Sequence, residues 1–158
     1  MSDSNFPELA NSFVCASMIH ESNGEWSAAT WALIHAAWAC DDASQSPQAV
    51  TCRKRAAAML RKAQASGQTL SDQPGAITTI LVDLLRRAGE LDEAAKVIQE
   101  SKATKTEDTV IRIMEYQTEL IQANDIGCHT IAEALGEETD HGVNESKPAR
   151  KRWWQFWQ

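Results

Sequence analysis

A short chain-reversing pattern occurs twice in this sequence and constrains its fold more than any other feature. Residues 24–26 are Gly-Glu-Trp and residues 89–91 are Gly-Glu-Leu, and in both places an alanine follows three positions after the large apolar residue. Glycine permits a tight reversal of the backbone between two helices. The large side chain then packs back on the first helix, while the small alanine lets the two backbones come close. The pattern therefore predicts helices that double back on one another.

Apolar residues recur at helical spacing around these junctions, and proline, glycine and polar clusters mark the ends of each run. Alanine is frequent and runs of β-branched residues are short, which favours helix over strand. We therefore expect helices over residues 6–22, 25–40 and 47–66, from Pro74 to Gly89, from Leu91 to about Ile98, and from about Thr106 onward. The last helix either continues through Leu135 or breaks at Asn124 and Asp125.

The first two predicted helices differ in how they should be buried. The helix over residues 6–22 carries one apolar stripe, made of Leu9, Phe13, Ala16 and Ile19, which predicts the face that packs on its neighbour. The helix over residues 25–40 is apolar almost all round. A helix with that character belongs in the middle of a domain.

The two Gly-Glu junctions resemble the middle of the tetratricopeptide repeat, in which glycine, an acidic residue, a large apolar residue and alanine recur at this spacing. The likeness is best over residues 77–101 and weaker over residues 13–39. The junctions are 89 − 24 = 65 residues apart, near twice the repeat period of about 34. The resemblance implies an all-α domain of antiparallel helical hairpins, forming a right-handed array of about six to seven helices.

A second resemblance concerns three helical segments, residues 36–43, 52–60 and 81–94. They are similar to the helical part of uncharacterised bacterial proteins of unknown function. In those proteins, similar helices follow a cysteine-rich, metal-binding N-terminal region that has no counterpart in this sequence. The resemblance therefore implies a bacterial helical protein, and it carries no metal role over to this chain.

Charge and composition exclude several classes of function. The formal net charge is -7, and a field of that sign opposes binding to the phosphate backbone of nucleic acids. Residues 1–5 lack the basic start and apolar run of a secretory signal, so we expect a cytoplasmic protein whose four cysteines are reduced. No apolar stretch approaches the roughly 20 residues that a membrane-spanning helix needs.

The sequence contains no recognisable catalytic or metal-binding motif. It lacks a phosphate-binding glycine loop, an H-E-x-x-H motif and a nucleophile elbow. Cys15 and His20, like His35 and Cys40, are five residues apart, a spacing that does not stack two side chains on one helix face. We therefore expect no catalytic residues, no metal and no cofactor, and a protein that is not an enzyme.

Basic residues gather on two of the predicted helices. The helix over residues 47–66 has no acidic residue, and in an acidic protein it could line a groove that binds an acidic peptide. The alternative is an ordinary solvated face that balances acids such as Asp41 and Asp42. The candidate partner-binding residues are Arg53, Lys54, Arg61, Lys62, Arg86 and Arg87.

The character of the chain changes after residue 136. We expect a helical-repeat domain over residues 1–136 and a disordered tail over residues 137–158, acidic at first and then basic and aromatic. Three roles for the end of the tail stay open: contact with an anionic membrane surface, a linear motif for a protein partner, or docking on the helical body. The residues concerned are Arg150, Lys151, Arg152, Trp153, Trp154, Phe156 and Trp157.

These observations favour a cytoplasmic scaffold or adaptor that binds a peptide or helix of an unidentified protein partner. Stacked helical hairpins present extended grooves that suit such partners. The alternative is a peripheral protein that its C-terminal tail brings to the inner membrane face. Nucleic acid is not an expected partner in either case.

Overall fold

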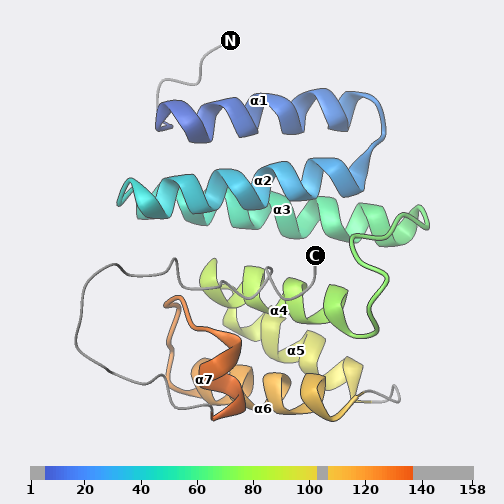
Figure 1. The fold of residues 1–158 in the computed structure, drawn as a ribbon, viewed down its shortest axis with the longest axis vertical. Coiled ribbons are helices and arrows are strands. Elements are labelled where there is room, and N and C mark those ends of the chain that lie inside the picture. The colour runs from blue at the N-terminus through green and yellow to red at the C-terminus, as the bar shows by residue number, and fades with distance from the viewer. Residues whose placement is uncertain (1–5, 103–106, 137–158) are drawn as a thin grey trace.

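The computed structural model describes residues 6–102 and 107–136, and within these ranges the chain is built of α-helices, with no strand (Figure 1). The prediction of an all-α fold is therefore confirmed. The predicted tail, residues 137–158, lies outside the described residues. The seven described helices are α1 (Glu8–Ser22), α2 (Trp26–Asp42), α3 (Ser46–Ala65), α4 (Ala76–Arg87), α5 (Leu91–Ser101), α6 (Asp108–Gln122) and α7 (Ile131–Leu135).

The structure decides between the two alternatives for the end of the chain's helical part. Helix α6 ends at Gln122, and the backbone at Asn124 turns into the left-handed region with φ of 54°. Helix α7 then begins with a capping box, in which Thr130 accepts a hydrogen bond from the Glu133 N–H and Glu133 accepts one from the Thr130 N–H. The long predicted helix therefore breaks, as the Asn124 alternative proposed.

Five of the helices end in the same way. In each, one residue has positive φ, and the N–H of the next residue donates a hydrogen bond to the carbonyl five positions before it. This bond satisfies a carbonyl at the end of the helix. The five bonds are Glu25 to His20 (2.9 Å), Gln45 to Cys40 (2.8 Å), Gln68 to Ala63 (2.9 Å), Glu90 to Leu85 (2.9 Å) and Asp125 to Leu120 (2.8 Å). At the two repeated junctions, Gly24 and Gly89 supply the positive φ, and Ala29 and Ala94 are fully buried.

The helices form two groups that are stacked along the long axis of the molecule (Figure 1). One group contains α1, α2 and α3, with α2 packed against both of the others, and the second contains α4 to α7. Ten of the 17 residues of α2 are buried, so its predicted central position is confirmed. The larger apolar cluster runs from α2 to α7, and a smaller one joins α1, α2 and the start of α3.

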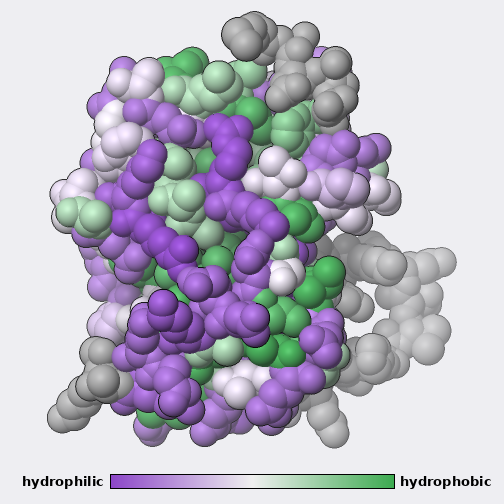
Figure 2. Space-filling model, turned by 180° about the vertical axis from the view of Figure 1, so that it is seen from behind, coloured by the Kyte–Doolittle hydropathy of each residue, from purple (hydrophilic) through white to green (hydrophobic). Residues whose placement is uncertain are grey.

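Helix α1 packs through a different face from the predicted one. Leu9 and Ile19 are each 62% exposed, and the buried face consists of Ala10, Val14 and Ser17. These small side chains face the small residues of α2 in the same apolar cluster, which lets the two helices approach closely. The predicted stripe was wrong at Leu9 and Ile19, whereas its Phe13 is partly buried against this cluster. Apolar residues reach the surface at the α1 end of the molecule (Figure 2).

None of the helices in the described part of the chain is both long enough and apolar enough to cross a membrane.

Candidate functional site

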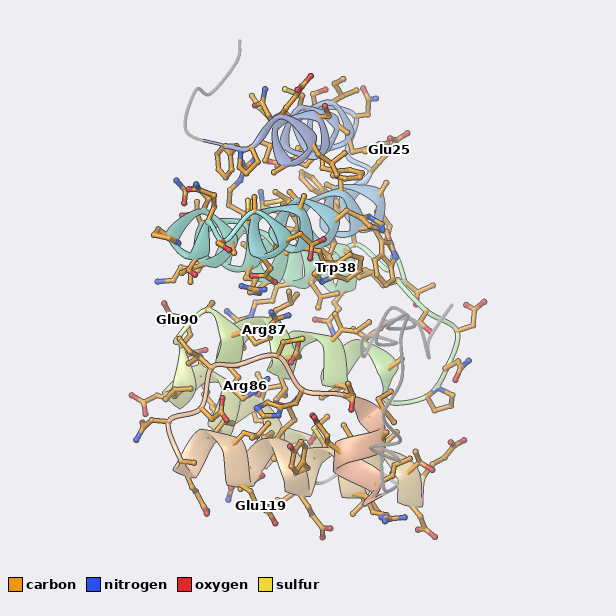
Figure 3. All side chains as sticks on the ribbon, turned by 60° about the vertical axis from the view of Figure 1, so that its left-hand side comes forward. Glu25, Trp38, Arg86, Arg87, Glu90 and Glu119 are labelled. Carbon is orange, nitrogen blue, oxygen red and sulfur yellow. The ribbon has the colours of Figure 1, made fainter. Side chains whose placement is uncertain are left out.

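The carboxylate of Asp41 joins three helices. It lies in the last turn of α2, and its Oδ2 accepts hydrogen bonds from Arg53 of α3 and, at 2.8 Å, from Nη2 of Arg87 of α4. Arg53 is only 5% exposed. Burial, followed by the neighbouring charge of Arg87, lowers the pKa of Arg53. Both arginines therefore point into the junction between the two groups of helices, and Figure 3 shows Arg87 at this junction.

The remaining basic residues of α3 lie at the surface and contact groups of the same chain. Lys54 forms an ion pair with Glu90 at 2.6 Å, and Arg61 forms one with Glu93 at 3.0 Å. The ammonium of Lys62 lies 4.7 Å from the centre of the Trp26 ring. Exposed ion pairs of this kind contribute about 1 kcal/mol or less each.

Arg86 is the most deeply buried of the predicted partner-binding residues. Its side chain is completely buried and donates to Oε1 of Gln117 (2.7 Å), to Oδ1 of Asp83 (3.0 Å), and to the carbonyls of Asp125 (2.6 Å) and Gly127 (3.0 Å). It thereby fixes the loop between α6 and α7. The six candidate residues therefore do not form one exposed surface. Three of them, Arg53, Arg86 and Arg87, point inward, and the other three contact side chains of the same chain at the surface.

A groove that sequence analysis did not identify opens between the start of α4, the end of α5 and one side of α6. Its volume is about 730 Å³. Ile98, Val110 and Met114, all of them buried, form an apolar floor. Glu115 and Glu119 of α6 are exposed and make one wall acidic, and Lys102 lines the groove at the end of α5.

Gly75 sets the distance between α4 and α6 at one end of this groove. It has φ of +79°, and a Cβ at this position would lie 2.8 Å from Cγ1 of Val110. Only glycine therefore allows the start of α4 to come this close to α6. The one sequence signal for the groove was a glycine in the first turn of the helix predicted from Pro74, whereas the observed helix begins only at Ala76.

Four rings lie in contact along α1 and α2. The Phe13 ring stacks on His35 with centroids 5.2 Å apart, and His35 is 4.8 Å from Trp38, edge to face, and 6.2 Å from Trp31. Burial lowers the pKa of His35, although a hydrogen bond with the Trp31 backbone opposes this shift. The imidazole is therefore neutral at pH 7. We call these four residues the ring row.

A polar cluster surrounds His129 in the loop before α7. Nε2 of His129 lies 3.0 Å from Asp125, and Nδ1 lies 3.2 Å from Glu133 and 3.1 Å from the Tyr116 hydroxyl. Within residues 6–102 and 107–136, no group of three His, Cys, Asp or Glu side chains is arranged to hold a metal ion. The cluster connects α6, α7 and the loop between them.

The candidate tail residues, from Arg150 to Trp157, fall outside the described residues, so their predicted roles stay predictions. No protein-family model, curated protein or solved structure matches the chain.

Proposed function

We propose that the protein is a non-enzymatic interaction module, a cytoplasmic adaptor that binds a segment of a protein partner in the groove between α4, α5 and α6. The observation that carries this proposal is the combination of an apolar floor with an acidic wall in a volume of about 730 Å³. Such a site suits one or two apolar side chains with a basic residue beside them.

The proposal includes a repeat architecture. In this proposal the helices pair as antiparallel, tetratricopeptide-like hairpins in a right-handed array. The common geometry of the junctions at Gly24 and Gly89 supports this arrangement. Helical arrays bind partners along the surfaces that their stacked helices expose.

Selection of peptides from a displayed random library on the full-length protein tests the proposal. We expect selected peptides to combine apolar and basic residues. We expect a Thr118→Trp variant, which places an indole in the groove, to bind them about tenfold more weakly, because the indole competes for the apolar floor. Binding is measured by titration calorimetry.

The matched control is Gln99→Trp, which adds the same ring at an exposed position of α5 that does not line the groove. It should bind the peptides like the original protein. Circular dichroism and urea unfolding establish that both variants fold. A selection that yields no peptide above background, or peptides that bind the Thr118→Trp variant equally well, contradicts the proposal.

A further inference from the structure

The ring row forms an aromatic strip along one side of α2. Trp31, His35 and Trp38 follow one another at intervals of four and three residues, so they lie on one face of the helix. Phe13 of α1 adds a fourth ring through its contact with His35. Phe13, Trp31 and His35 are half-buried, so part of each ring is accessible to a further aromatic side chain.

At the carboxyl end of α2, the aromatic strip is followed by a negatively charged residue. Asp42 follows Trp38 by four residues on the same face of α2, and its side chain is exposed. It lies at the carboxyl end of the helix, where the last carbonyls add partial negative charge. A ligand that matches this surface has aromatic residues at one end and basic residues at the other.

The end of this chain has that composition in that order. Arg150, Lys151 and Arg152 precede Trp153, Trp154, Phe156 and Trp157. From Trp31 to Asp42, α2 rises about 16 Å, and an extended chain from Lys151 to Trp157 spans about 20 Å. The lengths therefore correspond when the segment runs opposite to α2, with its basic residues over Asp42.

The segment is joined to the helical body by a short connection in the same chain. Thirteen residues, 137–149, lie between Gly136, where the described chain ends, and Arg150, so the two are 150 − 136 = 14 residue steps apart. A flexible linker of that length has an average span of about 20 Å and a limit of about 46 Å. A tether of this kind gives an effective concentration in the millimolar range.

We propose that residues 150–157 fold back and dock on the ring row of α1 and α2 in the same molecule, with the basic residues at Asp42 and the aromatic residues along the accessible rings of His35, Trp31 and Phe13, while Trp38 stays buried beside them. The groove between α4, α5 and α6 is a less suitable site, because it offers acidic residues but no aromatic ring. Docking covers the four aromatic side chains of the segment and withholds them from a membrane surface. This inference is independent of the proposed function of the groove.

Fluorine NMR of the full-length protein, labelled with 5-fluorotryptophan, tests the docking. Replacing each tryptophan with phenylalanine in turn assigns its resonance. We expect Trp153, Trp154 and Trp157 to be shielded from a soluble gadolinium chelate, compared with the free peptide of residues 147–158. We expect Asp42→Lys to lower the docking equilibrium constant about fivefold, by replacing an attraction with a repulsion.

Asp92→Lys, an equally exposed charge reversal on α5, is the matched control and should leave the shielding unchanged. Trp31→Ala should weaken docking about tenfold through the loss of ring contact. The inference is overturned if the chelate affects the tail tryptophans equally in the original protein and in the free peptide. Shielding that survives Trp31→Ala and disappears in Thr118→Trp overturns it in favour of the groove. Resonances that change only when vesicles of anionic phospholipid are added overturn it in favour of a membrane surface.

Discussion

Nε of Arg86 donates a hydrogen bond to Oε1 of Gln117 at 2.7 Å, and both side chains are completely buried. The same guanidinium also binds the carbonyls of Asp125 and Gly127. A buried charge is tolerated only when its donors are satisfied. Arg86 of α4 thus supplies donors to the carbonyls of the loop between α6 and α7, and it holds this loop together with the His129 cluster.

Replacing Arg86 with leucine should destabilise the fold strongly. The change leaves Gln117 Oε1 and two loop carbonyls without their donor, so we expect the free energy of unfolding to fall by about 3 kcal/mol. Urea unfolding followed by circular dichroism measures the difference. Arg61→Leu removes an ion pair whose members are 48% and 47% exposed, and should cost less than about 1 kcal/mol. Equal losses in the two variants would show that Arg86 has no special role.

Gly75→Ala should cost more stability than Gly67→Ala. Both glycines have positive φ, +79° and +72°, so each substitution carries a backbone cost of about 1 kcal/mol. At Gly67 a Cβ meets nothing within 4 Å, whereas at Gly75 it meets Val110 at 2.8 Å. We expect an additional loss of about 1–3 kcal/mol for Gly75→Ala, measured by thermal or urea unfolding. A Val110→Ala change in that background should recover part of the loss, and its failure to do so would exclude the clash as the cause.

Ser44→Gly should stabilise the protein. Ser44 has φ of 57° in the turn between α2 and α3, a conformation that costs a residue with a side chain about 1 kcal/mol. Glycine removes this cost, so the unfolding midpoint in urea should rise. Ser66→Gly is the control, because Ser66 ends α3 with φ of -94° and gains nothing from glycine. A midpoint that does not rise for Ser44→Gly, or rises equally for both, would argue against strain at Ser44.

The thiol of Cys52 should make the fold sensitive to alkaline pH. Burial is the main cause that raises the pKa of Cys52 from 9.0 to about 12. Between these values the unfolded chain loses the proton while the folded chain retains it. Stability from this group is therefore complete below pH 9 and falls by about 1.4 kcal/mol per pH unit above it.

Urea unfolding at pH 8.5 and 10.5 measures this dependence, and the difference between variants separates Cys52 from other groups that titrate in the same range. Cys52→Ala should reduce the loss of stability between the two values. Cys128→Ala, which removes an exposed thiol, should leave the loss unchanged. Identical losses in the original protein and in Cys52→Ala would contradict the prediction.

The sequence predicted most of the helices because glycine and proline mark their ends, and Gly24, Gly67 and Gly89 all have the positive φ that such an end requires. It did not predict which face of α1 is buried. Ala10 and Ser17 are small, and their burial depends on how closely α2 approaches, which is a property of the pair of helices and not of either alone.

The burial of one basic residue, Arg53, could have been predicted from the sequence. Arg53 precedes Ala57 by four residues and Leu60 by seven, so it falls on the buried face of α3, and its charge is balanced by Asp41. Helical spacing alone could have placed it inside. The groove was not predictable in this way, because it arises where the start of α4 meets α6 in space, at Gly75 and Val110.

Each helix packs against its neighbour along the chain, and three of the six connections between helices are three residues long. Native contacts therefore form between segments that are already close before folding begins, and little entropy is lost in closing the loops. Proteins with this distribution of contacts reach the native state within milliseconds or less. The helix pairs joined at Gly24 and at Gly89 can therefore begin to form independently of each other, whereas the contacts of Asp41 with Arg53 and Arg87 are complete only when both groups of helices have come together.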